Sequence, residues 1–225
     1  GMMHNFTIIV NRANEGGDYE FEVKTEEVMD WIDDPDLHDG IVREYIIVHI
    51  DEPGTLRAKV DAMDSDYLEF VALKITGVIN HDDLRFIGEH LVSMTALNLR
   101  DVTITGNDDE KDAIAWIGGR QHSGNRGTLR HIVLPKNLKK ICDGAFKNLS
   151  LVGSINIPDS VEYIGWAAFF ENYLYGELIL PSSLKFLGAE AFALNPGISG
   201  QLYLPEGLEV IEWEPHRGVF GDNQF

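Results

Sequence analysis

A pattern that recurs four times between residues 129 and 211 constrains the fold of this chain more than any other feature. Each copy contains one proline, and Pro135, Pro158, Pro181 and Pro205 follow one another at steps of 23, 23 and 24 residues. Aliphatic residues stand three and one positions before each proline and three and six positions after it. In order along the chain they are Ile132, Leu134, Leu138 and Ile141; Ile155, Ile157, Val161 and Ile164; Leu178, Leu180, Leu184 and Leu187; and Leu202, Leu204, Leu208 and Ile211. The first three copies close with an Ala-Phe pair, at Ala145-Phe146, Ala168-Phe169 and Ala191-Phe192.

Each position of this repeat has a physical interpretation. The alternation before the proline predicts a short strand with one buried face, because successive side chains of a strand point to opposite sides. Proline lacks an N–H group, so it ends the strand at a turn. Alanine is small enough to lie where neighbouring copies touch, and phenylalanine fills the middle of each copy. Since no copy can bury its apolar edge alone, the copies must stack on one another.

Three asparagines recur thirteen or fourteen residues after the prolines, at Asn148, Asn172 and Asn195. They stand among turn-forming residues, where an asparagine side chain commonly hydrogen bonds to the backbone. We predict that each of the three makes such a bond in the turn of its own copy.

The pattern L-x-x-I-x-L-P-x-x-L-x-x-I-x-x-x-A-F resembles the BspA-like leucine-rich repeats of bacterial surface proteins, and its four copies cover about a third of the chain. A period of roughly 20–29 residues is typical of leucine-rich repeats in general. The resemblance implies an α/β fold, a right-handed leucine-rich repeat solenoid of about six coils with a parallel sheet of short strands. It also implies a non-enzymatic module, without a cofactor, that binds a protein or another host or cell-surface ligand. Several members of the family are adhesins, so a secreted or cell-surface location is implied as well.

The net charge of −19 is unevenly distributed along the chain. Residues 1–70 carry 18 acidic side chains against 5 basic ones. Such a surface repels phosphate backbones, which argues against nucleic-acid binding. The densest acidic run, residues 26–39, does not fit a calcium loop, because a loop that starts at Asp34 would place Tyr45 where a glutamate is needed. We interpret this run as a solvated acidic face and predict no metal site.

Residues 1–40 are predicted to form a small α/β unit, separate from a solenoid that occupies residues 41–225 with its N-terminal cap. Alternating apolar residues at 6–10 and 19–23 flank the turn-forming run 14–18, which predicts a β-hairpin. Thr25 can cap a short helix that begins with two glutamates and ends before Pro35.

Residues 41–105 are predicted to form the cap and the opening coils. A strand is expected at 44–50, followed by a helix over residues 56–63, where apolar residues stand at helical spacing. Asn80 is expected to cap a second helix whose apolar side carries Leu84 and Ile87. The strand positions of two looser copies lie 24 residues apart, at Leu73 and Ile75 and at Leu97 and Leu99.

The run from Gly118 to Gly127 belongs to a surplus of about a dozen residues between the opening coils and the first proline. It is rich in glycine and locally basic, so it could be a contact loop or a phosphate cradle. It lacks the glycine spacing of known phosphate-binding loops, and we interpret it as a mobile surface loop. The lone Cys142 excludes an internal disulfide and is predicted to be a small buried hydrophobe.

The predicted ligand-binding residues lie on the concave face, between and just before the buried pair of each strand. The inner column is Lys74, Asn98, Val133, Asn156, Ile179 and Tyr203, and the outer column is Ala72, Ala96, His131, Ser154, Glu177 and Gln201. Six short strands at ~4.8 Å spacing offer on the order of 250 Å². A stable interface buries about 800 Å² per partner. We therefore expect the 118–127 loop or the N-terminal unit to contribute, or binding to be weak and multivalent.

The repeat pattern breaks after Ile211, where Pro215-His216 stands in place of the next Ala-Phe pair. Terminal repeats need a polar cap, yet this tail offers the apolar residues Trp213, Val219, Phe220 and Phe225. These side chains either cover the last copy or contact a second molecule. We expect a monomer in which they cover it, with an end-to-end dimer through the C-terminal copy as the alternative.

Two other functions stay open. One is a carboxylate-based hydrolase that uses the acidic N-terminal unit, although the chain has no H-E-x-x-H, G-x-S-x-G or C-x-x-C motif. The other is an intracellular interaction scaffold. No run of eighteen apolar residues predicts a membrane span, and no signal peptide is visible. The sequence thus leaves open whether the chain is intracellular or a mature secreted form.

Overall fold

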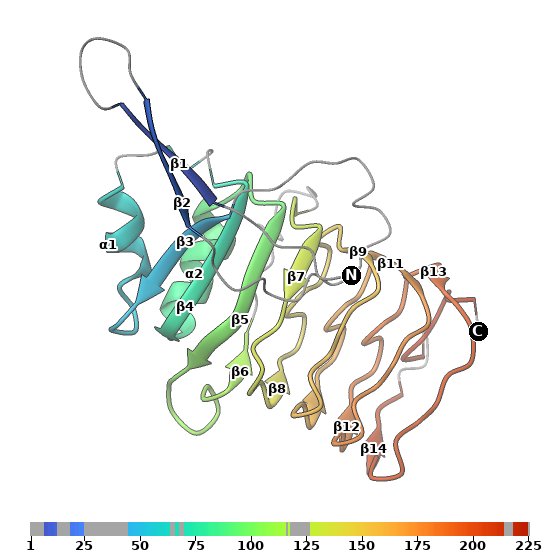
Figure 1. Cartoon of the computed structure of the whole chain (residues 1–225). Coiled ribbons are helices and arrows are strands. Elements are labelled where there is room, and N and C mark those ends of the chain that lie inside the picture. The colour runs from blue at the N-terminus through green and yellow to red at the C-terminus, as the bar shows by residue number, and fades with distance from the viewer. Residues whose placement is uncertain are drawn as a thin grey trace. The chain divides into compact units, whose positions relative to one another are not determined.

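A computed structural model of the chain describes residues 7–12, 19–24, 45–63, 66–67, 70–115, 117, 127–213 and 218–224. The chain divides into two compact units, Gly1–Ile41 and Val42–Phe225 (Figure 1). The helix that Thr25 would cap, the acidic run 26–39 and all but Gly127 of the loop 118–127 lie outside the described residues.

The first unit contains a two-stranded antiparallel sheet. Its strands are β1 (Thr7–Arg12) and β2 (Tyr19–Lys24), paired from Thr7↔Lys24 to Arg12↔Tyr19. Strand β2 alternates in sequence between apolar and polar residues, which is the pattern of a half-buried strand, whereas β1 carries three consecutive apolar residues at 8–10. The predicted hairpin is confirmed.

The second unit begins with a four-stranded parallel sheet in the order β3-β4-β5-β7. Its strands are β3 (Ile46–Ile50), β4 (Ala72–Ile79), β5 (Ala96–Ile104) and β7 (His131–Val133), and helices α1 (Leu56–Asp61) and α2 (His81–His90) connect the first three. Leu73 pairs with Leu97, and Leu97 pairs with Ile132. All three side chains are buried, so the aliphatic strand positions of successive copies meet in one core, as predicted.

The buried carboxylate of Asp83 joins the two helices at their N-termini. Asn80 caps α2, and the Asp83 side chain accepts the backbone N–H of Asn80 at 3.0 Å, which completes a capping box. The same carboxylate accepts the N–H groups of Gly54 at 2.7 Å and Leu56 at 2.9 Å, at the start of α1. The predicted cap at Asn80 is confirmed, and Asp83 satisfies backbone donors of both helices at once.

The later repeats add two further parallel sheets. Strands β6 (Ala113–Ile114), β8 (Lys140–Ile141), β10 (Tyr163–Ile164), β12 (Phe186–Leu187) and β14 (Val210–Ile211) form the first, in the order β14-β12-β10-β8-β6. Strands β9 (Val152–Gly153), β11 (Tyr173–Gly176) and β13 (Gly197–Ile198) form the second. In Figure 1 the strands of each of these two sheets follow one another along a separate edge of the second unit. The second, third and fourth copies therefore each contribute one short strand to both stacks, whereas the first copy contributes β8 to the first stack and β7 to the N-terminal sheet.

The strand predicted before each proline forms only in the first copy, where it is β7. The prediction is wrong for the other three copies, whose residues 154–157, 177–180 and 201–204 belong to no strand. A glycine with positive φ directly precedes each of these segments, at Gly153 (86°), Gly176 (81°) and Gly200 (96°). This left-handed backbone turns the chain out of a ladder, and glycine adopts it without a steric penalty. Arg130 occupies the equivalent position before β7, and there the strand forms.

A column of phenylalanine rings occupies the centre of the repeats. Phe146, Phe169 and Phe192 are fully buried, and neighbouring ring centroids lie 5.1 Å apart with interplanar angles of 23° and 9°. Stacked rings at this distance contribute about 0.5–1.5 kcal/mol beyond their burial. The alanines that precede them are also fully buried, which confirms the predicted roles of both residues.

Asn172 and Asn195 connect neighbouring repeats as well as their own turns. The Asn172 oxygen accepts the N–H groups of Leu149 and Leu151 at 3.2 and 3.0 Å, and its amide donates to the carbonyl of Phe146 at 2.8 Å. Within its own turn the amide donates to the carbonyl of Phe169 at 3.0 Å. The predicted side chain to backbone bonds are thus confirmed for these two asparagines, and their reach extends to the preceding copy.

The same prediction is wrong for Asn148. In the first copy the position equivalent to Asn172, 23 residues earlier, is occupied by Leu149. Asn148 lies one residue before it, with a φ of 58°. Glu171 and Leu194 have φ values of 56° and 59° at the equivalent places. The Asn148 side-chain oxygen is buried without a hydrogen-bond partner. Its role is to tolerate the left-handed backbone, which asparagine does better than most residues.

The C-terminal segment supplies the fourth copy of the Ala-Phe turn. The Phe220 ring stacks on Phe192 with centroids 6.1 Å apart, and Val219 before it is buried. Asn223 accepts the N–H of Asn195 at 3.1 Å and donates to the carbonyl of Phe192 at 3.1 Å. Val219 and Phe220 thus pack on the third copy as the turn of the fourth, while Leu204, Ile211 and Trp213 of the fourth copy are exposed and Phe225 lies outside the described residues. The repeat spacing predicts the pair at Pro215-His216, which lies outside the described residues, whereas V-F-x-x-N stands at 219–223, displaced by an insertion.

Candidate functional site

The first sheet brings the N-terminal halves of the two predicted binding columns into register. Ala72 pairs with Ala96 and Ala96 with His131, while Lys74 pairs with Asn98 and Asn98 with Val133. Each column therefore runs directly across β4, β5 and β7. In a parallel sheet such a row of side chains points to one face.

Most of these N-terminal members are too buried to contact a partner. Ala72, Ala96 and Asn98 are buried, and the Asn98 side-chain oxygen accepts the N–H of Arg100 at 3.0 Å. The Lys74 side chain is only 12% exposed, and its ammonium lies 3.7 Å from the Asp101 carboxylate. The two alanines are too short to project far from the sheet, and the longer side chains of Asn98 and Lys74 interact with their own neighbours. These four residues do not form part of an accessible surface.

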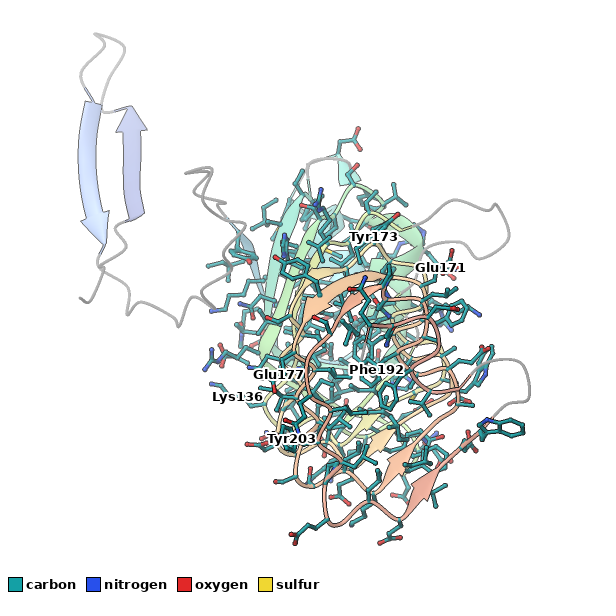
Figure 2. All side chains as sticks on the ribbon, turned by 90° about the vertical axis from the view of Figure 1, so that its right-hand side faces the viewer. Lys136, Glu171, Tyr173, Glu177, Phe192 and Tyr203 are labelled. Atoms are coloured by element: carbon teal, nitrogen blue, oxygen red, sulfur yellow. The ribbon has the colours of Figure 1, made fainter. Side chains whose placement is uncertain are left out.

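The C-terminal members of the columns are exposed instead. Ile179 is 71% exposed and Tyr203 is 64% exposed. We define the exposed pre-proline patch as the six exposed residues of the two columns, Ser154, Asn156, Glu177, Ile179, Gln201 and Tyr203. Figure 2 shows Glu177 and Tyr203 on the same side of the second unit. His131 and Val133, in the first copy, are half-buried.

One hydrogen bond orients the largest side chain of this patch. The Tyr203 hydroxyl donates to the side-chain oxygen of Gln201 at 2.8 Å. This bond fixes the two side chains relative to one another, with Leu202 between them in the chain. The ring face of Tyr203 remains exposed, with a polar neighbour at its rim. Aromatic side chains with one apolar face and one polar atom are typical of protein interfaces.

A comparison with known families identifies the C-terminal repeats. Residues 122–215 match the BspA type leucine rich repeat region, in 6 copies. These residues are a BspA-type leucine-rich repeat region. The resemblance drawn from the sequence is thereby confirmed for this segment, whereas β4 and β5 precede it. No curated protein and no solved structure matches the chain.

The presence of this region suggests a protein-interaction module. Proteins with BspA-type regions are generally non-enzymatic and are often surface-associated. Neither helix in the described part of the chain has the length and apolar character to cross a membrane. The described residues also contain no group of three or more His, Cys, Asp or Glu side chains placed to hold a metal ion.

The BspA-type region carries a column of alternating charges on its first stack of strands. The Lys139 ammonium lies 3.2 Å from the Glu162 carboxylate, and the Lys185 ammonium lies 2.6 Å from it on the other side. These residues recur at the repeat spacing, and Glu209 follows at the next step. The hydrogen bond from Lys185, followed by the one from Lys139, lowers the pKa of Glu162. The spacing of 23 and 24 residues could have revealed this column from the sequence.

The single cysteine of the region has the properties of a packed side chain. Cys142 is half-buried, and burial is the main cause that raises the pKa of its thiol. A thiol with a raised pKa is a poor nucleophile. The positions equivalent to Cys142 in the next two copies are Gly165 and Gly188, so the residue belongs to the close contact between repeats.

Proposed function

We propose that the BspA-type region is a right-handed solenoid that binds a protein ligand through the exposed pre-proline patch, and that it serves adhesion at the cell surface. The observation that carries the proposal is the exposure of Ile179 and Tyr203, at 71% and 64%. Ile179 stands on a backbone held in place by buried neighbours on either side, Leu178 and Leu180, whereas Tyr203 lies between the partly buried Leu202 and the exposed Leu204. Rigid exposed apolar groups of this kind mark interaction sites.

The solenoid architecture is supported by the way in which the repeats contact one another. Each strand of the β6–β14 stack pairs in parallel with the strand one repeat away. The phenylalanine rings and the buried asparagines make the same one-repeat steps. An array in which each unit contacts only its neighbours is the defining property of a solenoid.

The patch is polar around its apolar centre, which fits a specific protein surface better than a lipid. Asn156, Glu177 and Gln201 are exposed beside Ile179 and Tyr203, and they can hydrogen bond at the rim of an interface. The patch is small, so it supports moderate affinity, and several copies on one surface would act together through multivalency.

The test is a binding screen with purified extracellular-matrix and plasma proteins, measured by biolayer interferometry with the full chain on the sensor. The double variant Ile179→Asp/Tyr203→Asp should lose binding to any protein that the unchanged chain captures. The matched control is Val71→Asp/Val92→Asp. It introduces the same two charges at exposed apolar residues outside the patch, which are 47% and 51% exposed. Equal loss in both variants, or none in the first, would contradict the assignment of the patch.

The location is tested separately from the binding chemistry. Antibody labelling of intact cells that produce the protein should detect the chain at the surface, and permeabilised cells provide the comparison. Detection only after permeabilisation would favour the intracellular scaffold instead, with the same patch as its interaction surface.

A further inference from the structure

The last repeat exposes residues that every earlier repeat buries. Position by position, Leu180 and Leu187 of the third copy are buried, whereas Leu204 and Ile211 of the fourth are 50% and 47% exposed. Trp213, two residues later, is 73% exposed. The residue types are the same, and the difference is that no further repeat packs against this copy within the described residues. We name Leu204, Val210, Ile211 and Trp213 the terminal apolar edge.

The terminal apolar edge includes β14, which is the last strand of its sheet. Strand β14 is the last in the order β14-β12-β10-β8-β6 and pairs only with β12 among the described strands. An edge strand leaves backbone hydrogen-bonding groups available to another chain. Natural edges are commonly protected by lysines or prolines, yet the two residues of β14, Val210 and Ile211, are both aliphatic.

The charge column indicates which sign of charge a strand added beyond β14 should carry. Lys139, Glu162 and Lys185 alternate in sign with contacts of 3.2 and 2.6 Å, and Glu209 is the next member. The hydrogen bond with Glu162 raises the pKa of Lys185, and the charge of Glu209 raises it further. Continued by one step, the alternation predicts a cation after Glu209.

The same charges disfavour a second copy of this chain as the occupant. Residues 201–213 contain Glu206, Glu209 and Glu212 and no lysine or arginine. Two such edges brought together would oppose glutamate to glutamate, and like charges at close range are destabilising. A basic segment removes this repulsion and also covers the apolar side chains.

We propose that β14 and the terminal apolar edge bind an extended, basic and apolar peptide segment of a partner protein, added to the sheet as a further parallel strand. The segment carries Lys or Arg opposite Glu209, followed two residues later by an aliphatic side chain that packs on Ile211. Strand addition of this kind takes affinity from backbone hydrogen bonds and specificity from alternate side chains. The third repeat displays the required order at Lys185-Phe186-Leu187.

A peptide copied from that repeat is the probe. A fluorescein-labelled nonapeptide with the sequence of residues 181–189, PSSLKFLGA, is titrated with the full chain and followed by fluorescence polarisation. Saturable binding is expected. Ile211→Asp should weaken it at least about tenfold, because a carboxylate would replace the apolar contact. Trp213→Ala, at a 73% exposed position, provides a second test in which folding is not at risk.

A charge exchange tests the pairing with Glu209. Glu209→Lys should weaken binding of the Lys peptide by about two- to fivefold, the range of an exposed ion pair. It should strengthen binding of a peptide with Glu in place of Lys by a similar factor. Val71→Asp, which lies outside both the exposed pre-proline patch and the terminal apolar edge and is 47% exposed, should bind the Lys peptide like the unchanged chain.

Three outcomes would overturn the proposal. The first is a peptide that does not saturate, and the second is equal binding by the unchanged chain, Ile211→Asp and Trp213→Ala. The third is a concentration-dependent dimer in sedimentation velocity that Ile211→Asp abolishes, because the edge would then bind a second copy of the chain. Melting curves from circular dichroism establish that each variant compared is folded.

Discussion

The side-chain amide of Asn195 donates a hydrogen bond to the backbone carbonyl of Phe169 at 2.9 Å, although the two residues are 26 positions apart. The same side chain accepts the N–H of Leu174 at 3.2 Å and donates to the carbonyl of Phe192 at 2.9 Å. One buried polar residue therefore satisfies backbone groups of two consecutive repeats. A buried backbone group that loses its partner costs about 1–3 kcal/mol.

Asn172→Leu should consequently destabilise the second unit by at least about 3 kcal/mol, because it removes partners from the N–H groups of Leu149 and Leu151 and from the carbonyl of Phe146. Leucine is chosen since the first copy has Leu149 at this position. The free energy of unfolding is measured by urea denaturation. Asn148→Gly is the control and should be neutral or stabilising, because Asn148 has a φ of 58° and an unpaired side-chain oxygen. A larger loss in the control would contradict this assignment.

Phe169→Ala should lower the free energy of unfolding by about 3–5 kcal/mol. Its ring is fully buried and stacks at 5.1 Å on both Phe146 and Phe192. Phe220→Ala is the matched control, since that ring is half-buried and stacks on Phe192 at the longer distance of 6.1 Å. It should cost clearly less. A loss below about 1 kcal/mol for Phe169→Ala would mean that the ring is not part of the core.

Gly188→Ala should destabilise the repeats through steric overlap. A methyl group at this position would lie 2.4 Å from backbone atoms of Gly165 and Trp166, so two repeats would have to separate. Gly144→Ala separates this effect from backbone strain, because its methyl group would meet only the Lys147 side chain at 3.9 Å while its φ is 61°. We expect about 1 kcal/mol for Gly144→Ala and a larger loss for Gly188→Ala. Equal losses in thermal unfolding would show that the close contact relaxes.

The carboxylate of Glu162 should titrate below its ordinary range in the folded chain. Hydrogen bonds from Lys185 and then Lys139 lower its pKa. Because the folded pKa lies below the unfolded one, the stabilisation is present above the unfolded pKa and is lost as the pH falls through the folded pKa. A carboxyl NMR titration measures the midpoint, which Lys185→Met should raise and Lys111→Met should leave unchanged. An identical midpoint in all three proteins would argue against the ion pair in solution.

The thiol of Cys142 should react slowly with a disulfide reagent at neutral pH. Burial raises the pKa of this thiol, and the thiolate is the reactive form. The absorbance of the released thiolate should rise quickly only after denaturant is added. Complete reaction of the folded chain at the rate of free cysteine would show that the side chain is accessible.

Residue spacing alone determined the repeat and its core. Aliphatic side chains at intervals of 23 or 24 residues can be buried together only if equivalent positions stack, and Leu138, Ile141 and Phe146 of the first copy are buried as this requires. The capped helix at Asn80 and the hairpin of the first unit are equally local, since capping and turn residues act within a few positions.

Tertiary structure decided which segments became strands and which surfaces stayed open. The alternation at Ile155 and Ile157 is that of a strand, yet the left-handed Gly153 turns the backbone away and the pairing moves to residues 152–153 and 163–164. The exposure of the predicted binding residues could likewise not be read from the repeat pattern. Asn98 and Tyr203 occupy equivalent positions, but one bonds within its sheet and the other lies at the end of the array. A repeat motif specifies what each residue faces within its own copy, whereas burial depends on whether another copy lies beyond it.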